Sequence, residues 1–500
     1  MSKILQKAQE YENSSLKNET EQQKRLRPRF HFSTPVGWCN DPNGFSYYNG
    51  KIHLFFQYHP YSTQWGPMHW GHVSTTDLIN WKNEKTALAP DTPADESGCF
   101  SGTALEKNAR HLLVYTGVSK QNGIDIQNQC IAWGDGETYE KSAKNPVITA
   151  KNIPFEYTTT DFRDPKIFEK NGNLYMLCAL KQKDGKGCLV MFKSSDSLAE
   201  KWEFIATIDK SKDGLSGMWE CPDYFTLQDT EFLIISPQEM KANPKLGFHD
   251  GNNSVYITGK LDFDKGIFTR TVRPENNYTA AQIDYGIDFY APETIQLSDG
   301  RRILIGWMQA WESYITPKEN LWSGMMTIPR ELSINSGRLI QNPVKELNSL
   351  RKNPQNFTIP SNTKGTISSQ DNRHFDFEIE FSAQKGIFSL HLAEKKRSEN
   401  SFPSYIEIKY DAEKKELSFD RSHTQNAGAI SSRSVIIEPN SNGNIKFRLI
   451  ADTCSVEIFA NNGLTAFTNA FFVPPENTGL YYESTLNGEI KCQFFTLGTD

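Results

Sequence analysis

The stretch DPNGF (41–45), which a short turn joins to the alternating apolar run KIHLFFQY (51–58), is the first copy of a unit that recurs along the chain. The later apolar runs are RHLLVYTG (110–117), NLYMLCAL (173–180), EFLIISP (231–237) and RRILIGW (301–307). The elements before them are SGTAL (101–105), DPKIF (164–168), CPDYF (221–225) and APETI (291–295). A period of about 60 residues is too long for a helical repeat and is near that of a propeller blade. The sequence therefore predicts an all-β chain that begins with a five-bladed β-propeller.

One position of this unit is predicted to gather polar side chains. It is occupied in turn by Asp41, Ser101, Asp164, Cys221 and Ala291, and Glu220 lies directly before the fourth of these. If each apolar run is the strand nearest the axis, the residues before the runs meet at one mouth of the central channel, although they are far apart in sequence. We therefore expect an acidic funnel formed by Asp41, Asp164 and Glu220.

The rest of the chain divides by composition and periodicity. Residues 1–28 are polar and rich in Glu, Lys and Gln, which predicts a helical extension before a propeller of residues 29–340. Helical spacing predicts a linker helix over 341–354. From 355 to 500, short alternating strands with hairpin turns indicate a C-terminal β-sandwich. Nothing in the sandwich sequence indicates catalysis, so we expect the site in the propeller.

Composition bounds the partners and the compartment. The formal net charge of −6 and the lack of a basic run give no electrostatic reason to bind nucleic acid. No apolar run approaches the ~20 residues of a membrane span, and the N-terminal stretch lacks the apolar core of a signal peptide. We therefore expect a cytoplasmic protein. Its eight cysteines include no CxxC pair, which favours reduced core thiols over zinc. No metal or cofactor is predicted, and a homo-oligomer is left open.

Three converging carboxylates without a His cluster favour cleavage of a glycosidic bond. That reaction needs one carboxylate to attack or stabilise the anomeric carbon and one carboxylic acid to protonate the leaving oxygen. Flat apolar faces for sugar rings are offered by Trp38, Trp65, Trp70, Trp219, Trp307, Trp311 and Phe100. Two alternatives are a calcium site, although no DxDxDG-type run exists, and turn capping by Asp before Pro. Recurrence of the acids at one repeat position favours the catalytic interpretation.

The segments WCNDPNG (38–44), FRDPK (162–166) and WECPD (219–223), in this order, resemble the three signatures of glycoside hydrolase family 32. The resemblance implies a five-bladed propeller followed by a β-sandwich, which agrees with the repeat. It also implies that Asp41 is the nucleophile, Asp164 the transition-state stabiliser and Glu220 the general acid/base. The family retains configuration, which requires the carboxyls of Asp41 and Glu220 to lie roughly 5 Å apart. Asp164 is expected to stay ionised beside Arg163.

The resemblance also implies a set of substrate-binding residues. These are Asn40, Gln57, Trp65, Phe100, Ser101, Arg163 and Trp307. Some have a second interpretation: Gln57 and Ser101 can satisfy backbone groups at strand ends, and Trp307 can belong to the core. Glu293, where the family commonly has Gln, has no assigned role at this point.

The predicted activity is that of a retaining β-fructofuranosidase, which removes a terminal fructosyl unit from sucrose or short fructo-oligosaccharides. The segment QAWE (309–312) resembles enzymes that act on unphosphorylated sugars, whereas RPRFHFSTPVGW (27–38) resembles the phosphate-accepting branch. Sucrose-6-phosphate hydrolase is therefore the first alternative. A fructosyltransferase is a less favoured alternative, which would keep all three acids and differ only in how well the acceptor site excludes water. A carbohydrate-binding protein without catalysis would have no need of the full set of acids.

Overall fold

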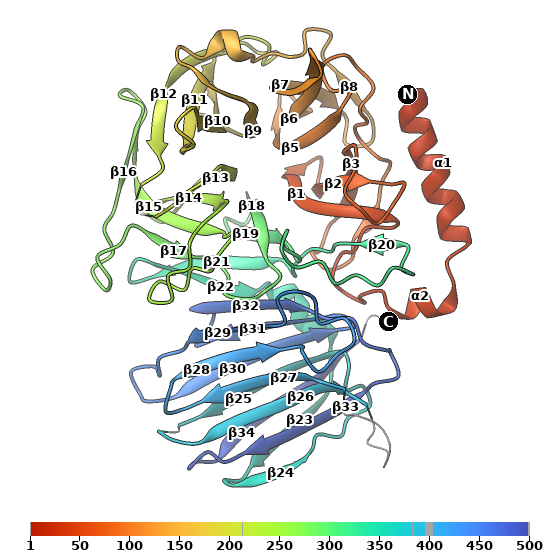
Figure 1. Ribbon diagram of the computed structural model, residues 1–500, viewed down its shortest axis with the longest axis vertical. Coiled ribbons are helices and arrows are strands. Elements are labelled where there is room, and N and C mark those ends of the chain that lie inside the picture. The colour runs from red at the N-terminus through yellow and green to blue at the C-terminus, as the bar shows by residue number, and fades with distance from the viewer. Residues whose placement is uncertain (1, 213, 383, 396–403, 499–500) are drawn as a thin grey trace.

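A computed structural model describes residues 2–212, 214–382, 384–395 and 404–498, and shows a ring of five sheets packed on a sandwich of two sheets (Figure 1). The predicted all-β architecture, a five-bladed propeller followed by a β-sandwich, is confirmed. Within the described residues, no helix is both long enough and apolar enough to cross a membrane.

Each blade is an antiparallel sheet whose first strand carries the repeated polar element. Blade 1 contains β1 (Gly37–Tyr48), β2 (Lys51–His59), β3 (His69–Thr75) and β4 (Lys82–Asn83). Blade 2 contains β5 (Gly98–Lys107), β6 (Arg110–Gln121), β7 (Ile124–Gly134) and β8 (Tyr139–Lys141), and is followed by the 3₁₀ helix η1 (Ala150–Asn152). Blade 3 contains β9 (Tyr157–Lys170), β10 (Asn173–Gln182), β11 (Gly187–Ser194) and β12 (Glu203–Lys210). Blade 4 contains β13 (Trp219–Leu227), β14 (Thr230–Pro237), β15 (Val255–Asp262) and β16 (Ile267–Arg270), with β17 (Ala280–Gln282) on β15. Blade 5 contains β18 (Tyr290–Gln296), β19 (Arg302–Trp307), β21 (Arg330–Asn335) and β22 (Arg338–Pro343).

The ring is closed between the last blade and the first. The long connection from β19 to β21 crosses to blade 1, where β20 (Trp322–Ser323) pairs in parallel with β1. In this pairing Gly37 lies opposite Trp322 and Trp38 opposite Ser323. Residues from the end of the propeller therefore complete the sheet that its first residues begin.

The strand nearest the axis is not the apolar run, as the sequence suggested, but the polar element before it. The first strands β1, β5, β9, β13 and β18 contact one another from blade to blade. The apolar runs are the second strands; seven consecutive residues of β10 are buried, for example. A run that is apolar on both faces suits a position between packed neighbours, whereas a polar strand suits the solvated axis. The convergence at one mouth is unaffected, because both strands of a hairpin reach it.

Every first strand carries a β-bulge at the same place. One extra residue stands between Cys39 and Pro42, between Phe100 and Gly102, between Arg163 and Lys166, between Glu220 and Asp223, and between Tyr290 and Glu293. In three blades the first residue of the repeated element has positive φ: 62° at Asp164, 47° at Cys221 and 49° at Ala291. Such a conformation costs about 1–3 kcal/mol for a residue other than glycine. The bulge re-aims the side chains at the mouth, which an even pleat would not do.

The third residue of each repeated element points to the neighbouring blade and bridges it. These residues are Asn43, Thr103, Lys166, Asp223 and Glu293, which we call the axial ring. The bridges are Gly102 N–H to Asn43 Oδ1 (3.2 Å), Thr103 Oγ1–H to Pro165 O (2.8 Å), Lys166 Nζ to Asp223 Oδ1 (2.9 Å), Thr294 N–H to Asp223 Oδ2 (2.6 Å) and Phe45 N–H to Glu293 Oε2 (2.8 Å). The axial ring thus links all five blades, and Glu293 has a structural role in it.

The sandwich consists of two six-stranded sheets around one apolar core. One sheet has the order β23 (Arg351–Ile359), β34 (Ile490–Leu497), β25 (Phe375–Phe381), β30 (Ile445–Asp452), β31 (Ser455–Ala460) and β32 (Thr465–Ala470). The other has the order β24 (Thr363–Thr366), β33 (Gly479–Ser484), β26 (Ile387–Glu394), β27 (Ile406–Asp411), β28 (Glu416–Asp420) and β29 (Ser432–Ile436). Between the two bodies lies the 3₁₀ helix η2 (Lys345–Leu350), which is shorter than the predicted linker helix because strands β22 and β23 flank it closely.

Buried charges join the sandwich to the propeller. Arg330 of β21 donates to Asp284 Oδ2 (2.9 Å) and to Glu457 Oε2 of the sandwich. His31 lies between Asp452 (2.8 Å) and Glu457 (2.9 Å). Burial alone would lower the pKa of His31, but the two carboxylates outweigh it and raise the pKa to about 9. The imidazolium form therefore belongs to the junction at neutral pH.

Two helices precede the first blade. Helix α1 (Lys3–Lys17) lies against the outer side of blade 1 (Figure 1), where the Tyr58 hydroxyl donates to Glu12 Oε2 (2.8 Å) and Tyr11 donates to Tyr61 O (3.2 Å). Helix α2 (Glu21–Arg25) follows, with Thr20 and Gln23 forming a capping box at its start.

The axial ring predicts a pH-dependent stability effect at Glu293. Burial raises the pKa of Glu293 to about 8, against the opposing effect of Lys166. Since an unfolded Glu titrates near 4.3, the native state holds the extra proton between these two pH values, and its stability falls as pH rises through the interval. Glu293→Gln cannot titrate and keeps an acceptor for Phe45 N–H. As pH is raised from 5 to 8, we expect the free energy of unfolding of this variant to increase relative to that of wild type by roughly 2 to 4 kcal/mol.

Thermal unfolding of both proteins at pH 5, 6, 7 and 8 measures this change. Glu140→Gln, at an exposed position of β8, is the matched control and is expected to show a constant difference. A Tm difference between Glu293→Gln and wild type that does not vary with pH would contradict the raised pKa of Glu293.

Candidate active site

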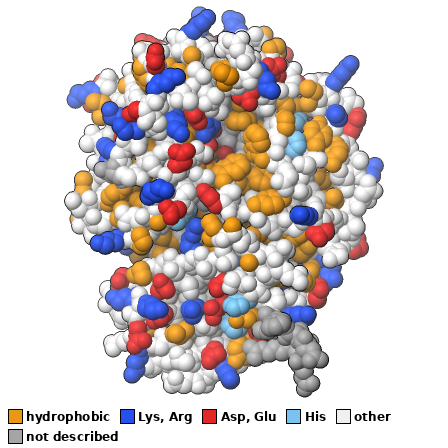
Figure 2. All heavy atoms as spheres, in the orientation of Figure 1, with side chains coloured by type: hydrophobic (Ala, Val, Ile, Leu, Met, Phe, Trp, Pro, Cys, Tyr) orange, Lys and Arg blue, Asp and Glu red, His pale blue; other side chains and the backbone are white. Residues whose placement is uncertain are grey.

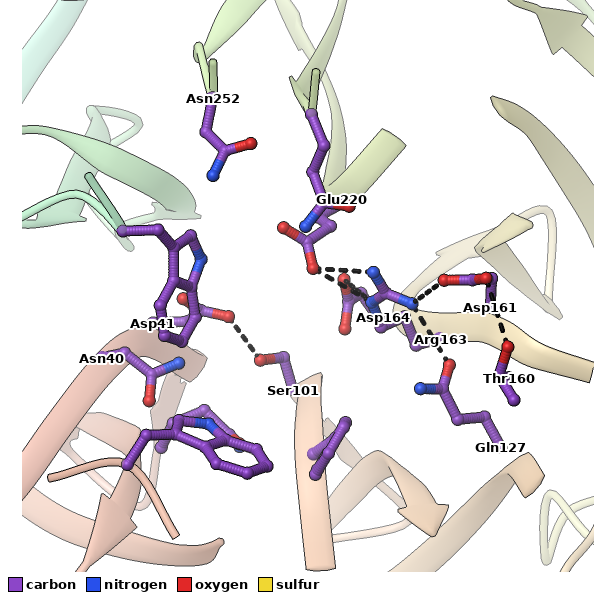
Figure 3. A pocket seen from close by; sticks show the side chains of 15 residues that line it. Asn40, Asp41, Ser101, Gln127, Thr160, Asp161, Arg163, Asp164, Glu220 and Asn252 are labelled. Carbon is purple, nitrogen blue, oxygen red and sulfur yellow. Dashed lines mark hydrogen bonds and ion pairs between the residues drawn. The ribbon is translucent and has the colours of Figure 1, made fainter. Parts of the chain in front are cut away.

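A pocket of about 360 Å³ opens at the mouth of the ring. In Figure 2 the propeller face is hollowed near its centre, and hydrophobic side chains gather beside the hollow. The pocket is lined by Asn40, Asp41, Gln57, Trp65, Phe100, Ser101, Gln127, Thr160, Asp161, Arg163, Asp164, Glu220, Gln238, Asn252 and Trp311. Its volume is that of a small-molecule site. Asp41, Asp164 and Glu220, which the repeat predicts to converge, all line it (Figure 3).

Of the predicted substrate-binding residues, Trp307 alone does not line the pocket. It is fully buried, and its ring packs edge-on against Trp38 (5.8 Å between centroids) and Trp311 (5.1 Å). The predicted sugar contact of Trp307 is therefore corrected to a supporting position behind Trp311. Among the other tryptophans, Trp70 and Trp219 are also fully buried, because these strand ends face the packed interior between blades.

Asp41 lies on β1 and is held at one oxygen. The Ser101 hydroxyl of blade 2 donates to Asp41 Oδ2 (2.7 Å), so this hydroxyl serves the carboxylate (Figure 3). Burial raises the pKa of Asp41, and the nearby Glu220 adds to the rise, whereas the Ser101 hydrogen bond lowers it. The adjacent Asn40 is oriented by Trp38, whose Nε1–H donates to Asn40 Oδ1 (2.8 Å). The Asn40 side chain, fixed in this way, also lowers the pKa of the neighbouring Asp41 by a hydrogen bond to its carboxyl.

Gln57, at the end of β2, combines both interpretations given to it. Its side-chain amide donates to the backbone oxygen of Cys99 (3.0 Å), and the residue also lines the pocket. The backbone contact fixes the side chain, so its amide oxygen is positioned on the pocket side.

Asp164, on β9, is hydrogen-bonded to both neighbouring blades. Cys221 N–H donates to Asp164 Oδ2 (3.0 Å), and the N–H of Asp164 donates to Thr116 Oγ1 (3.0 Å). Burial raises the pKa of Asp164 to about 7; Arg163 opposes the rise, and the carboxyls of Glu220 and Asp41 add to it. Arg163, whose nearest nitrogen lies 3.8 Å from the Asp164 carboxyl, offsets the effect of burial only in part, so the pKa of Asp164 stays above its usual range.

Arg163 is directed mainly at Glu220. Its Nε and Nη2 donate to Glu220 Oε1 (3.0 and 2.9 Å), and its Nη1 donates to Asp161 Oδ1 (3.0 Å) (Figure 3). The other oxygen of Glu220 accepts a hydrogen bond from the Tyr290 hydroxyl (2.7 Å). Burial, together with Glu220, raises the pKa of Tyr290 well above its usual value, so its hydroxyl remains a donor. Both oxygens of Glu220 are thus oriented before substrate enters.

Five polar residues of the lining were not predicted. They are Gln127, Thr160, Asp161, Gln238 and Asn252. Gln127 comes from the third strand of blade 2, and Gln238 and Asn252 come from connections in blade 4, where the repeat has no common position. Asp161 is the exception, since it lies two residues before Arg163 and its charge could have been paired with that guanidinium from the sequence. In the parts of the chain that the structure describes, no three His, Cys, Asp or Glu side chains are grouped to hold a metal ion.

The arrangement places three carboxyls from blades 1, 3 and 4 in one cavity with donors fixed on each. The Ser101 hydroxyl binds one oxygen of the Asp41 carboxyl, Oδ2. The Glu220 carboxyl faces Asp41 from across the pocket in Figure 3. A carboxylate on one side of a bond and a proton-carrying carboxyl on the other is the arrangement that glycoside hydrolysis needs.

Comparison with known proteins agrees with this chemistry. The glycosyl hydrolases family 32 N-terminal domain matches residues 31–343, and the family 32 C-terminal domain matches residues 346–495. A sucrose-6-phosphate hydrolase of Escherichia coli is 33% identical over 470 residues, 91% of each chain. A raffinose invertase of the same organism is 37% identical over 338 residues, 66% of this chain and 67% of its own.

Solved structures give the same result. A Bombyx mori family 32 β-fructofuranosidase, determined as a mutant in complex with sucrose, superposes with a TM-score of 0.83 at 29% identity and covers 98% of this chain and 97% of its own. A sucrose-6-phosphate hydrolase from Lactobacillus gasseri has a TM-score of 0.83 at 26% identity, over 97% of this chain and 96% of its own. From these matches and the pocket that they accompany, the chain belongs to glycosyl hydrolase family 32 and is a glycoside hydrolase.

Proposed function

We propose that the protein is a retaining β-fructofuranosidase that releases the terminal fructosyl unit of sucrose and short fructo-oligosaccharides. The observation that carries this proposal is the set of three carboxyls in one pocket, with Asp41 bonded to Ser101 and with Glu220 bonded to Arg163 and Tyr290. Relatives named as β-fructofuranosidase and raffinose invertase support the substrate class.

In the proposed mechanism, Asp41 attacks C2 of the fructosyl unit and forms a covalent fructosyl-enzyme. Glu220 gives its proton to the glycosidic oxygen as the bond to the leaving sugar breaks. Glu220 then takes a proton from water, whose oxygen attacks C2 and frees Asp41, so configuration is retained. Asp164, held by Cys221 N–H, binds hydroxyls of the fructosyl unit while positive charge develops on the ring.

The proposal for a neutral sugar rests on the charges of the pocket. Among the described lining residues Arg163 is the one cationic side chain, and Glu220 and Asp161 already bind it. A sugar phosphate needs a cation or several free N–H donors. The mouth instead presents indole faces, with Trp65 49% exposed and Trp311 37% exposed, and such faces suit the C–H surfaces of unmodified sugars.

Sucrose-6-phosphate hydrolase is the second candidate, because the relatives from Escherichia coli and Bacillus subtilis that carry that name are 33% and 34% identical to this chain. Values of kcat/KM for sucrose, sucrose 6-phosphate and a fructan trisaccharide test the choice. We expect sucrose to exceed sucrose 6-phosphate by about tenfold or more, the cost of one unpaired phosphate. A higher value for the phosphate would overturn the proposal in favour of the second candidate. Product analysis at high sucrose would reveal fructosyl transfer in place of hydrolysis.

The nucleophile assignment predicts the behaviour of Asp41→Asn. An amide cannot attack C2, so we expect kcat to fall by at least about 10⁴-fold. Because the side chain is isosteric and Ser101 can still donate to its oxygen, we expect the Tm to stay close to that of wild type. Residual turnover near the wild-type level would remove Asp41 from the mechanism.

The Ser101 contact predicts a change in the pH profile. Its hydroxyl lowers the pKa of Asp41, so in Ser101→Ala that pKa rises and more alkaline conditions are needed to ionise the nucleophile. We expect the acidic limb of kcat/KM to move to higher pH, measured with sucrose between pH 4 and pH 8. Ser62→Ala, at an exposed serine outside the pocket, is the control. An unshifted acidic limb would show that Ser101 does not tune Asp41.

A further inference from the structure

One loop of the propeller reaches the pocket on one face and the sandwich on the other. It is the connection between β19 and β20, of which residues 308–320 are here called the shelf loop. Its outward residues Trp311 and Tyr314 are each 37% exposed, whereas Ser313 between them is fully buried. The alternation gives the loop two faces with different partners.

The outward face completes the mouth of the pocket. Trp311 and Tyr314 both stack on Trp38, at 6.1 and 6.0 Å between centroids. The Tyr314 hydroxyl donates to Thr63 O (3.2 Å) and accepts from Gln64 Nε2 (2.8 Å), in the segment that carries Trp65 of blade 1. These contacts fix the exposed rings of Trp311 and Tyr314 beside the segment that carries Trp65, with the buried Trp38 as their support.

A second contact ties the shelf loop to the opposite wall. Glu312 Oε1 accepts a hydrogen bond from the backbone N–H of Asn252 (2.8 Å), a pocket residue of blade 4. The approach is close, because a Cβ added at Gly251 would lie 2.3 Å from Glu312 Oε1. The position of the shelf loop therefore sets the width of the mouth between blades 1 and 4.

The inward face is held by one arginine of the sandwich. Arg421, which follows β28, is fully buried. Its five guanidinium hydrogen bonds go to Ser313 Oγ (2.9 Å), Asp288 Oδ2 (2.8 Å) and the backbone oxygens of Ala427 (2.9 Å), Ile430 (2.9 Å) and Ala470 (2.7 Å). All five donors of the side chain are used, three of them within the sandwich. Ser313 also donates to Asp288, which lies two residues before Tyr290 in the chain.

Apolar packing supports the same junction. Ile315 of the shelf loop belongs to a buried cluster with Cys454, Ala470 and Phe472 of the sandwich. It also lies against Gly428, where an added Cβ would be 2.6 Å from Ile315 Cγ2. The shelf loop is therefore packed against the sandwich surface.

We propose that Arg421 is a positioning residue through which the β-sandwich sets the leaving-group side of the pocket, by fixing Ser313 and so the exposed Trp311 and Tyr314. The proposal rests on the proposed function for the direction in which the substrate lies in the pocket. The terminal fructosyl unit occupies the deep end beside Asp41 and Asp164, and the leaving sugar lies at the mouth. Neither Arg421 nor Ser313 touches the substrate.

The first test measures the loop without any substrate. Amide hydrogen exchange of the full chain is compared for wild type, Arg421→Lys and Ser313→Ala. Thr316→Val is the matched control, because it removes another buried hydroxyl of the shelf loop that bonds to Ser323 rather than to the sandwich. We expect faster exchange in peptides covering residues 308–320 in the first two variants, and unchanged exchange in β1, β9 and β13. Unchanged exchange in the shelf loop would overturn the proposal.

The second test measures specificity. Ser313→Ala removes the hydroxyl that accepts from Arg421 and donates to Asp288, and is expected to raise KM for sucrose and for a fructan trisaccharide by about threefold to tenfold. The inhibition constant of free fructose, which fills the deep end, is expected to change by less than about twofold. In a Trp311→Ala background, Ser313→Ala should have little further effect on KM, because the two residues act as a unit.

Equal shifts in KM and in the fructose inhibition constant, or effects of Ser313 and Trp311 that simply add, would contradict the coupling. Failure of the proposed function is seen separately, as a wild-type protein that releases no fructose from neutral saccharides. If the wild-type protein releases no fructose, the hydrogen-exchange experiment still decides whether the sandwich holds the shelf loop.

Discussion

The active-site pocket depends on a β-bulge repeated at one position of five inner strands. In a regular strand, alternate side chains face opposite sides, and the first and third residues of the repeated element would share a side. The extra residue in each strand separates them, so that Asp41 and Asp164 face the pocket while Asn43 and Lys166 join the axial ring. The same irregularity therefore supplies both the acids and the bridges that hold them.

The acids share one electrostatic environment. Burial raises the pKa values of Asp41 and Asp164, and the nearby Glu220 carboxyl adds to both rises. Arg163 is the counter-charge, and it lies against Glu220 rather than midway among the three. A site of this kind titrates as a unit, so its pH dependence belongs to the group rather than to single residues.

The repeat in the sequence was sufficient to predict the propeller and the convergence of Asp41, Asp164 and Glu220, because equivalent strands bring equivalent positions together. The short alternating strands after the repeat predicted the sandwich. It placed the wrong strand next to the axis, because apolar patterning does not tell which strand of a hairpin is innermost. Trp307 could not be separated from Trp311, since exposure at a strand end depends on packing with the next segment. Glu293 had no interpretation because its neighbours Phe45 and Lys166 come from other blades.

Pairing of β20 with β1 has a consequence for how the chain is made. Trp38 and Asn40 leave the ribosome long before their later neighbours. The aromatic neighbours of Trp38 at positions 307, 311 and 314 and the strand partners of β1 at 322 and 323 follow almost three hundred residues further along the chain. The strand that carries Asp41 thus acquires its final surroundings only when the ring closes on itself. Until then, a nascent chain has the carboxylate but not the site.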